Sequence, residues 1–344
     1  MKQQKITIHW ILGGALLLIG LFVIIALVLT RSQGAAPSTS LTVTASAPSV
    51  DTIKLCSTTS ASPTSCSHVT TGVGLTLTSG TTTPYQIAGT ISDVNGWSDI
   101  ITFQGSFYRT SQLSASCDTS GEATSAPANC YYGDDVGAGG CTLTSTSATA
   151  GYFDCDLAVN YYSTATSADA VTGEQGVASD TWTVQGYVED TGLLNDTGTA
   201  LTEVNSLRAI ETDEGNACAT IAYGSLANGS ATSDSSLSGT DCVLENAGNV
   251  DTDVSESGTN MSCTFGSVAI ANQRVNVASG TYASMASGGT DLTVSAQNVN
   301  VALDKTSSTT KSTDSLFHAI SVPSTGASGA CTGTNTILAI SEVI

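Results

Sequence analysis

Hydrophobic residues are distributed unevenly along this 344-residue chain, and the longest apolar segment lies close to its start. Residues Trp10–Thr30 form an uncharged run of 21 mostly large aliphatic residues. An α-helix of that length crosses the hydrocarbon core of a bilayer, and a helix pairs its backbone groups within the segment. The pattern therefore predicts a single transmembrane helix over residues 10–30, preceded by a short N-terminus, residues 1–9.

The charges beside this segment predict its orientation. Lys2 and Lys5 precede it, and only Arg31 directly follows it. The positive-inside rule then places residues 1–9 in the cytoplasm and the bulk of the chain outside the cell, behind an uncleaved signal anchor. The alternative is a cleaved signal peptide with a site at Gly34-Ala35-Ala36, although the apolar core is longer than the about 7–15 residues typical of such peptides.

After the helix, the hydrophobic period changes to two. Residues 31–50 are small and polar and predict a flexible stalk. From Asp51 onward, apolar and polar residues alternate in short runs separated by Gly, Ser, Asn, Asp and Pro, which is typical of strands and turns. A Cys-, Gly- and Ser-rich insertion, residues 114–151, is predicted to be a loop held by disulfides. The alternating runs before the expected domain junction at residues 192–205 are Val73–Leu77, Tyr85–Ile91, Ile101–Phe107, Leu157–Tyr161 and Trp182–Val188.

A second series of short runs follows the junction, and none of the sequence after the anchor has helical periodicity. The expected class is all-β, with two Ig-like antiparallel β-sandwich domains, residues 51–200 and 201–344. The last run is apolar on both faces, which predicts a central position in its sheet. The runs of this half are 207–210, 220–223, 242–245, 250–255, 274–277, 292–294, 299–303, 317–322 and 334–344.

Ten cysteines follow the anchor, and none precedes it. An even number on the expected outer side favours disulfides in an oxidising compartment. A zinc site is the alternative, but the chain has no CxxC motif and no neighbouring pair of histidines. The sequence does not determine the connectivity, and we expect nearest-neighbour pairs. These are Cys56–Cys66, Cys117–Cys130, Cys141–Cys155, Cys218–Cys242 and Cys263–Cys331.

The net charge excludes one class of partner. Seven of the nine basic residues and all 29 acidic residues follow Thr30, so the exported part carries a net charge of −22. Such a surface repels nucleic acid. It suits solubility outside the cell, divalent cations or basic partners.

Two sets of segments carry a resemblance to a protein family. They are similar to bacterial surface proteins in which Ig-like β-sandwich domains follow an N-terminal hydrophobic segment. The resemblance implies a location and a fold, and it brings no catalytic residues. The segments are 91–100 (ISDVNGWSDI), 106–110 (SFYRT) and 182–190 (WTVQGYVED) in the first half, and 221–226, 245–249, 257–261 and 331–335 in the second.

One segment has ligand spacing for calcium. Asp93, Asn95 and Asp99 place oxygen atoms around a glycine turn, and Ca²⁺ prefers such ligands. The segment lacks the bidentate Glu of an EF-hand. The alternative is a plain hairpin turn, in which Asp93 caps the turn, Asn95-Gly96 supplies the positive φ and Trp97 packs on the sandwich. No other cofactor is expected.

Catalytic signatures are weak. The three histidines are His9, His68 and His318, and the chain has no GxSxG elbow. Candidate carboxylate pairs for glycoside hydrolysis lie in turn-like or exposed positions, and we interpret them as solvated charges. We make the same interpretation for Asp251 and Asp253. Trp97 and Trp182 are expected in the core rather than on a sugar-binding surface. The carboxylate candidates are Asp134 with Asp135, Asp154 with Asp156, and Glu211 with Asp213 and Glu214.

These observations favour a non-enzymatic cell-surface protein. The first hypothesis is a membrane-anchored structural or adhesion protein, held in the membrane by residues 10–30, with a protein or glycan partner. A second is a cleaved subunit of an extracellular filament joined by strand addition, with residues 41–45 or the last strand as donor. A third is an extracellular hydrolase.

Overall fold

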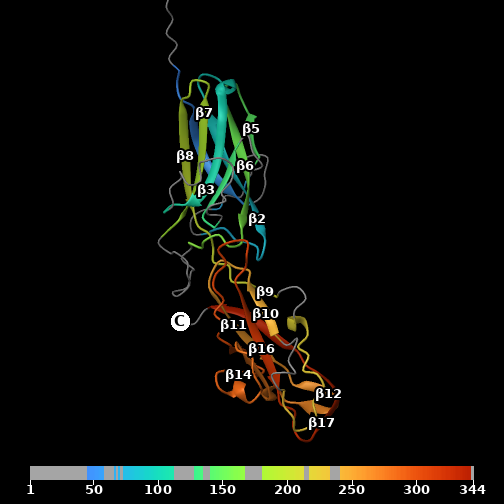
Figure 1. Ribbon diagram of the computed structural model, residues 1–344. Helices are drawn as coiled ribbons and strands as arrows, with labels where there is room; N and C mark the ends of the chain where they lie inside the picture. Colours follow the sequence, from blue (N-terminus) through green and yellow to red (C-terminus); the bar gives the residue numbers. More distant parts are fainter. Residues whose placement is uncertain are drawn as a thin grey trace, which may run out of the picture. The chain divides into compact units, whose positions relative to one another are not determined.

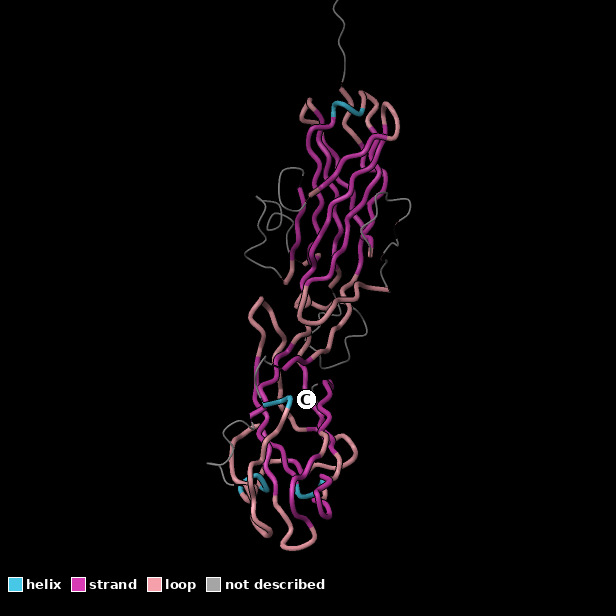
Figure 2. The backbone as a smooth tube through the Cα atoms, turned by 90° about the vertical axis from the view of Figure 1, so that its right-hand side faces the viewer, coloured by secondary structure: helices cyan, strands magenta, loops and turns pink. Residues whose placement is uncertain are grey.

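The computed structural model describes residues 45–57, 66, 69, 73–111, 128–134, 140–166, 180–212, 217–232 and 241–341. Residues 45–344 form one compact unit. The described part is all-β, as predicted, and its helical segments are short 3-10 turns (Figure 2). No helix in this part is long and apolar enough to cross a membrane. The expected anchor, residues 10–30, lies outside the described residues.

The first eight strands form two four-stranded antiparallel sheets, with strand orders β1-β2-β6-β5 and β4-β3-β7-β8 (Figure 1). The two sheets share one hydrophobic core, to which residues of β1, β2 and β6 contribute from one side and residues of β3 and β7 from the other. This is the packing of a β-sandwich. The strands are β1 (Ser49–Cys56), β2 (Thr82–Ser92), β3 (Ile100–Arg109), β4 (Cys130–Asp134), β5 (Cys141–Ser145), β6 (Ala150–Asn160), β7 (Trp182–Asp190) and β8 (Asn195–Thr202).

An aromatic stack fills one end of this core. The rings of Phe107 and Trp182 lie 4.5 Å apart at an interplanar angle of 25°, and Tyr131 stacks beside both of them. Trp182 is fully buried and donates its indole N–H to the carbonyl oxygen of Thr164 at 3.0 Å. The expectation that Trp182 is a core residue is confirmed. Trp97 is half-buried and packs against the same core.

A row of glycines crosses the second sheet at one level. Gly133, Gly105, Gly186 and Gly198 stand opposite one another in β4, β3, β7 and β8. A Cβ atom on Gly186 would lie 2.5 Å from the ring of Phe153, which comes from the facing sheet. Gly186 therefore leaves the room that this large side chain needs between the sheets.

The remaining strands form a five-stranded sheet of order β14-β13-β16-β10-β9, a three-stranded sheet β15-β11-β18 and a two-stranded sheet β12-β17. A second core contains residues of β10, β13 and β16 together with residues of β11 and β18. The strands are β9 (Ile210–Thr212), β10 (Asp241–Asn246), β11 (Thr252–Gly258), β12 (Met261–Val268), β13 (Gln273–Asn276), β14 (Thr290–Asp291), β15 (Gln297–Asn298), β16 (Thr313–Ile320), β17 (Ala327–Thr332) and β18 (Asn335–Ser341).

The prediction that the last strand lies at the centre of its sheet is wrong. Among the described strands, β18 lies at the edge of its sheet and pairs with β11 only. β11 holds the central position and is buried on both faces although its sequence, TDVSESG, is mostly polar. The apolar outer face of β18 is partly open to solvent, with Leu338 50% exposed. Apolarity on both faces therefore did not indicate a central strand in this sheet.

Several other elements differ from the expected pattern. β8 lies inside the predicted junction, and β4 and β5 lie inside the predicted loop insertion. β12 and β17 were not predicted, because their residues are mostly small or polar and strand formation depends on their tertiary partners. The runs at 73–77, 220–223, 292–294 and 299–303 are not strands.

Disulfides connect neighbouring elements in both halves. The described pairs are Cys56–Cys66, Cys141–Cys155, Cys218–Cys242 and Cys263–Cys331, which are four of the five expected. Cys130 is also disulfide-bonded, and its expected partner, Cys117, lies outside the described residues. Two of these bonds join residues that stand directly opposite each other on paired strands, Cys141 with Cys155 and Cys263 with Cys331.

Candidate functional site: a buried Glu–His–Asn cluster

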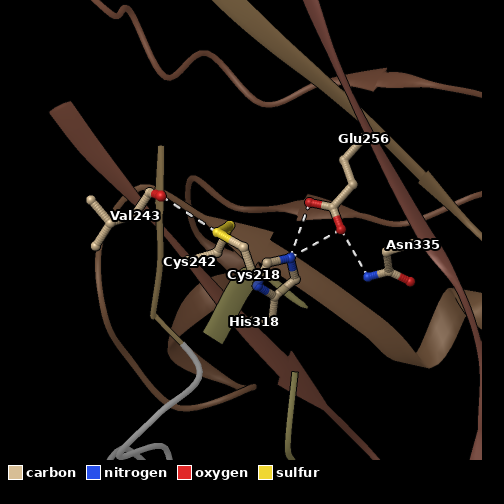
Figure 3. Close-up of a disulfide and its surroundings, with 6 residues drawn as sticks. All are labelled: Cys218, Cys242, Val243, Glu256, His318 and Asn335. Carbon is tan, nitrogen blue, oxygen red and sulfur yellow. Dashed lines mark hydrogen bonds and ion pairs between the residues drawn. A yellow bond between two sulfur atoms is a disulfide. The ribbon is translucent and has the colours of Figure 1, made fainter. Parts of the chain in front are cut away.

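Three polar side chains meet inside the second core (Figure 3). Nε2 of His318 lies 3.0 Å from each carboxylate oxygen of Glu256. Nδ2 of Asn335 donates to Oε1 of the same carboxylate at 2.8 Å. His318 belongs to β16 of the five-stranded sheet, whereas Glu256 and Asn335 belong to β11 and β18 of the three-stranded sheet. The cluster therefore bridges the two sheets.

The strand period explains why these side chains point inward. In β16, His318 lies between Leu316 and Ile320 on the buried face, and all three are almost completely buried. In β11, Glu256 shares a face with Val254, which is also buried. In each strand, therefore, the polar residue shares its face with a buried apolar residue and points into the core.

Glu256 and His318 depend on each other electrostatically, because both side chains are buried. The side chains of Glu256 and His318 are 0% exposed, and an unpaired carboxylate at such a position is strongly unfavourable. Because Nε2 faces two carboxylate oxygens, Nε2 carries the proton and donates it. Nδ1 of His318 has no hydrogen-bond partner among the described residues.

A second buried polar pair lies beside the cluster. The hydroxyl of Tyr223 donates to Oε1 of Gln273 at 3.2 Å. Burial raises the pKa of Tyr223, and the negative charge of Glu256 raises it further, so the phenol stays protonated. Nε2 of Gln273, a residue that is 2% exposed, has no hydrogen-bond partner among the described residues.

The Cys218–Cys242 disulfide lies near the cluster (Figure 3). It attaches the segment that leads to Tyr223 to β10, the neighbour of β16 in the five-stranded sheet. Sγ of Cys218 lies 3.5 Å from the carbonyl oxygen of Val243. The disulfide thus holds one side of the core in place around the polar residues.

This arrangement suits cross-linking better than catalysis. A general acid or base must come within hydrogen-bond reach of its substrate, but Glu256 and His318 are both closed to solvent. The hydrogen bonds of the His318 ring go to Glu256, and no serine of the described residues bonds to it. The other two histidines, His9 and His68, lie outside the described residues.

The segment predicted to bind calcium forms a turn. Oδ1 of Asp93 accepts the backbone N–H of Asn95 at 2.8 Å, and Nδ2 of Asn95 donates to the carbonyl oxygen of Ser46 at 2.6 Å. Asp99 ends the short 3-10 turn Trp97–Asp99. The capping role considered for Asp93 is therefore present. Among the described residues, no group of three His, Cys, Asp or Glu side chains is placed to hold a metal ion, and calcium binding stays a prediction.

The candidate carboxylates occupy ordinary polar positions where they are described. Asp154 and Asp156 both accept hydrogen bonds from Nε2 of Gln86, at 3.3 and 3.2 Å. Burial, and then the charge of Asp156, raises the pKa of Asp154. Glu211 shares Lys311 with Glu245, at 2.6 and 2.7 Å. Asp135, Asp213, Glu214 and the side chain of Asp134 lie outside the described part.

The interpretation of Asp251 and Asp253 as solvated charges is wrong. Asp251 is 8% exposed and Asp253 is 1% exposed. Oδ1 of Asp253 accepts the backbone N–H groups of Val254 and Val301, and Oδ1 of Asp251 accepts that of Lys305. Val299 and Leu303 of the same segment donate backbone N–H groups to carbonyl oxygens of β11. The two carboxylates therefore add to these bonds and hold the segment before residue 305 against β11.

Comparison with known proteins does not assign a family or an activity to this chain. No protein-family model and no curated protein matches the sequence. Among solved structures, a match is found to the secreted serine protease VesC from Vibrio cholerae, with 10% sequence identity over 78% of this chain and a TM-score of 0.17. This chain spans 49% of that protein. A TM-score this low carries no inference about fold or activity.

Proposed function

We propose that this chain is a non-enzymatic structural or adhesion protein of the cell surface, held in the membrane by residues 10–30 with the remaining chain outside the cell. The observation that carries the proposal is the set of disulfides within an all-β unit. Such bonds persist in oxidising compartments and are rare in the cytosol.

Two further features support the same conclusion. The chain carries a net charge of −20, which favours solubility outside the cell. The most deeply buried titratable pair, Glu256 with His318, serves to join two sheets and has no access to a substrate. Under this proposal the sheets and disulfides form a rigid body that presents a recognition surface.

Protease treatment of intact cells tests the location. We expect the chain in the membrane fraction, and we expect external protease to remove most of it while a short fragment that contains residues 1–30 survives. Lysed cells treated in parallel are the control for accessibility. A full-length chain that is protected in intact cells but cleaved after lysis would contradict the proposal.

A second candidate function is a filament subunit released by cleavage near Ala36 and joined to the next subunit by strand addition. The observation that favours it is the edge of β17 opposite β12, which pairs with no other described strand. N-terminal sequencing of the mature protein separates the two candidates. A start near Ala36 favours the filament, and a start at Met1 or Lys2 favours the anchored protein.

A further inference from the structure

A groove runs along β17 in the second half of the chain. Its volume is about 750 Å³, and its walls are residues 220–228 and residues 327–331. This volume lies within the range of about 300–1,000 Å³ that is usual for ligand sites. We call it the β17 groove.

Both walls present backbone groups that lack a strand partner. In the described part of the chain, residues 220–226 make no backbone–backbone hydrogen bond. β17 pairs with β12 on one side, and no other described strand pairs with its second edge. Cys331 and Cys263 stand opposite each other with their Cα atoms 3.9 Å apart, the close spacing of a pair whose N–H and C=O groups point away from the partner strand. The backbone of Cys331 therefore points toward the open edge.

The floor of the groove is apolar. Tyr223, Val268, Ile320 and Ala327 form a buried cluster, and Met261 packs against it. None of the described residues that line the groove is charged, although the chain contains 29 acidic residues. An occupant that fits this lining is uncharged and places apolar side chains on one face.

An unpaired donor lies beside the floor. A smaller hollow of about 370 Å³ shares Ile221, Tyr223, Met261 and Cys331 with the groove and is also lined by Gln273. Nε2 of Gln273 is buried without a hydrogen-bond partner among the described residues. A buried donor without an acceptor is costly, so the hollow beside the groove offers a polar contact that the described residues leave unused.

We propose that the β17 groove binds residues 41–45 of a second copy of this chain as an added β-strand. This segment, Leu-Thr-Val-Thr-Ala, is uncharged and has an apolar residue at every second position, so that one face meets the floor and the other meets solvent. Its five residues match the five residues of the β17 wall. Strand addition of this kind gains affinity from backbone hydrogen bonds and specificity from alternate side chains.

The other segment considered as a donor is already paired. β18 is hydrogen-bonded to β11 in register from Asn335 to Ser341, so its release would break the three-stranded sheet. The chain is fastened at Ser46, whose carbonyl oxygen accepts the hydrogen bond from Asn95, and residues 41–45 precede that point.

The proposed contact between copies is heterologous, because the donor segment and the groove are different surfaces, and it therefore links copies head to tail. It accounts equally for a surface coat and for a filament, so it does not depend on the membrane anchor.

Two variants of the full chain in mild detergent test this inference by sedimentation velocity. Val43→Asp places a charge on the donor, and Ala222→Trp fills the groove. Ala296→Trp is the matched control, because Ala296 is also exposed but does not line the groove. We expect the wild type and Ala296→Trp to form oligomers whose size grows with concentration, and we expect each of the other two variants to be monomeric.

A mixture of Val43→Asp and Ala222→Trp is the decisive sample. One variant retains an intact groove and the other an intact donor, so the mixture should form 1:1 dimers and nothing larger. A monomeric wild type, oligomers of unchanged size in both variants, or a mixture that stays monomeric would each overturn the proposal.

The second measurement compares two peptides of residues 38–47, one N-methylated on the odd-numbered and the other on the even-numbered residues. Their affinities for the Val43→Asp chain should differ by about tenfold, because strand pairing uses the N–H groups of one edge. Equal affinities for the two peptides would also contradict it.

Discussion

Replacing His318 with leucine tests the role of the buried cluster. Glu256 is completely buried and has two side-chain partners, His318 Nε2 at 3.0 Å and Asn335 Nδ2 at 2.8 Å. His318→Leu removes the first partner and leaves a carboxylate in the core with a single amide donor. Breaking a buried pair in this way costs about 3–5 kcal/mol. We therefore expect the free energy of unfolding of the second half to fall by that amount.

The double variant Glu256→Met/His318→Leu is the matched control. It removes both partners and fills the space with apolar atoms, which is often neutral in stability. We expect it to be more stable than His318→Leu alone, by about 3–5 kcal/mol. If the double variant is as unstable as the sum of the two single variants, the side chains do not act as a pair and the reasoning fails.

Urea unfolding monitored by two probes separates the halves of the chain. Two of the three tryptophans, Trp97 and Trp182, lie in the first half, and the third is Trp10. Tryptophan fluorescence therefore reports the first sandwich, whereas far-UV circular dichroism reports both halves. We expect His318→Leu to shift the unfolding transition of the second half, which circular dichroism detects. The transition of the first half, which fluorescence detects, should stay at the same urea concentration. A shift of the fluorescence transition by the same amount would show that the effect is not local.

Three further perturbations have definite expected outcomes. Removing Cys263–Cys331 by alanine substitution should lower the free energy of unfolding by about 4.4 kcal/mol, against about 2.7 kcal/mol for Cys56–Cys66, because their sequence separations are 68 and 10; equal losses in chemical denaturation would contradict the loop-entropy argument. Gly186→Ala should cost about 1–3 kcal/mol, because the new Cβ would lie 2.5 Å from the ring of Phe153, and an unchanged melting temperature would show that the sheets can separate at no cost. Asp154→Asn should raise stability at pH 7 by about 0.5 kcal/mol. The raised pKa of Asp154 favours folding at low pH, and this contribution to stability is lost as the pH rises from the ordinary value of 3.8 through the folded-state pKa. If the melting temperatures of the variant and the wild type depend on pH in the same way, this reasoning is refuted.

The strands that could be predicted from the sequence are those with large alternating side chains. β7 is an example, since Trp182, Val184 and Val188 all face the core. β12 and β17 could not be found in the same way, because they hold small and polar residues and their pairing includes a disulfide between positions 68 residues apart. Local pattern carries little information about such a long-range pairing.

The position of β18 and the burial of Asp253 show a second limit. Apolar residues on both faces of β18 suggested the centre of a sheet, but polar β11 lies there instead. β11 can be buried because Asp253 and Glu256 find partners on other segments, Val301 and His318. The composition of a strand alone does not show whether such partners exist.

The cluster itself left a faint signal in the sequence. His318 stands at a core-facing position between Phe317 and Ala319, which is unusual for a histidine, whereas Glu256 lies between Ser255 and Ser257 and gives no such signal. His318 interrupts the apolar run at residues 317–322, but nothing in that run indicates a partner. The two residues are 62 positions apart, and a single sequence contains no indication that they meet.

Disulfide mapping of the native protein tests the central claim most directly. Cells are treated with an alkylating reagent before lysis, and the protein is then digested without reduction and analysed by mass spectrometry. For a chain that folds in an oxidising compartment, we predict no alkylated cysteine and a linked peptide pair for each of Cys56–Cys66, Cys141–Cys155, Cys218–Cys242 and Cys263–Cys331. Alkylated cysteines throughout the chain, with no linked peptides, would show that these thiols are reduced in the cell and would contradict an extracellular, disulfide-linked surface protein.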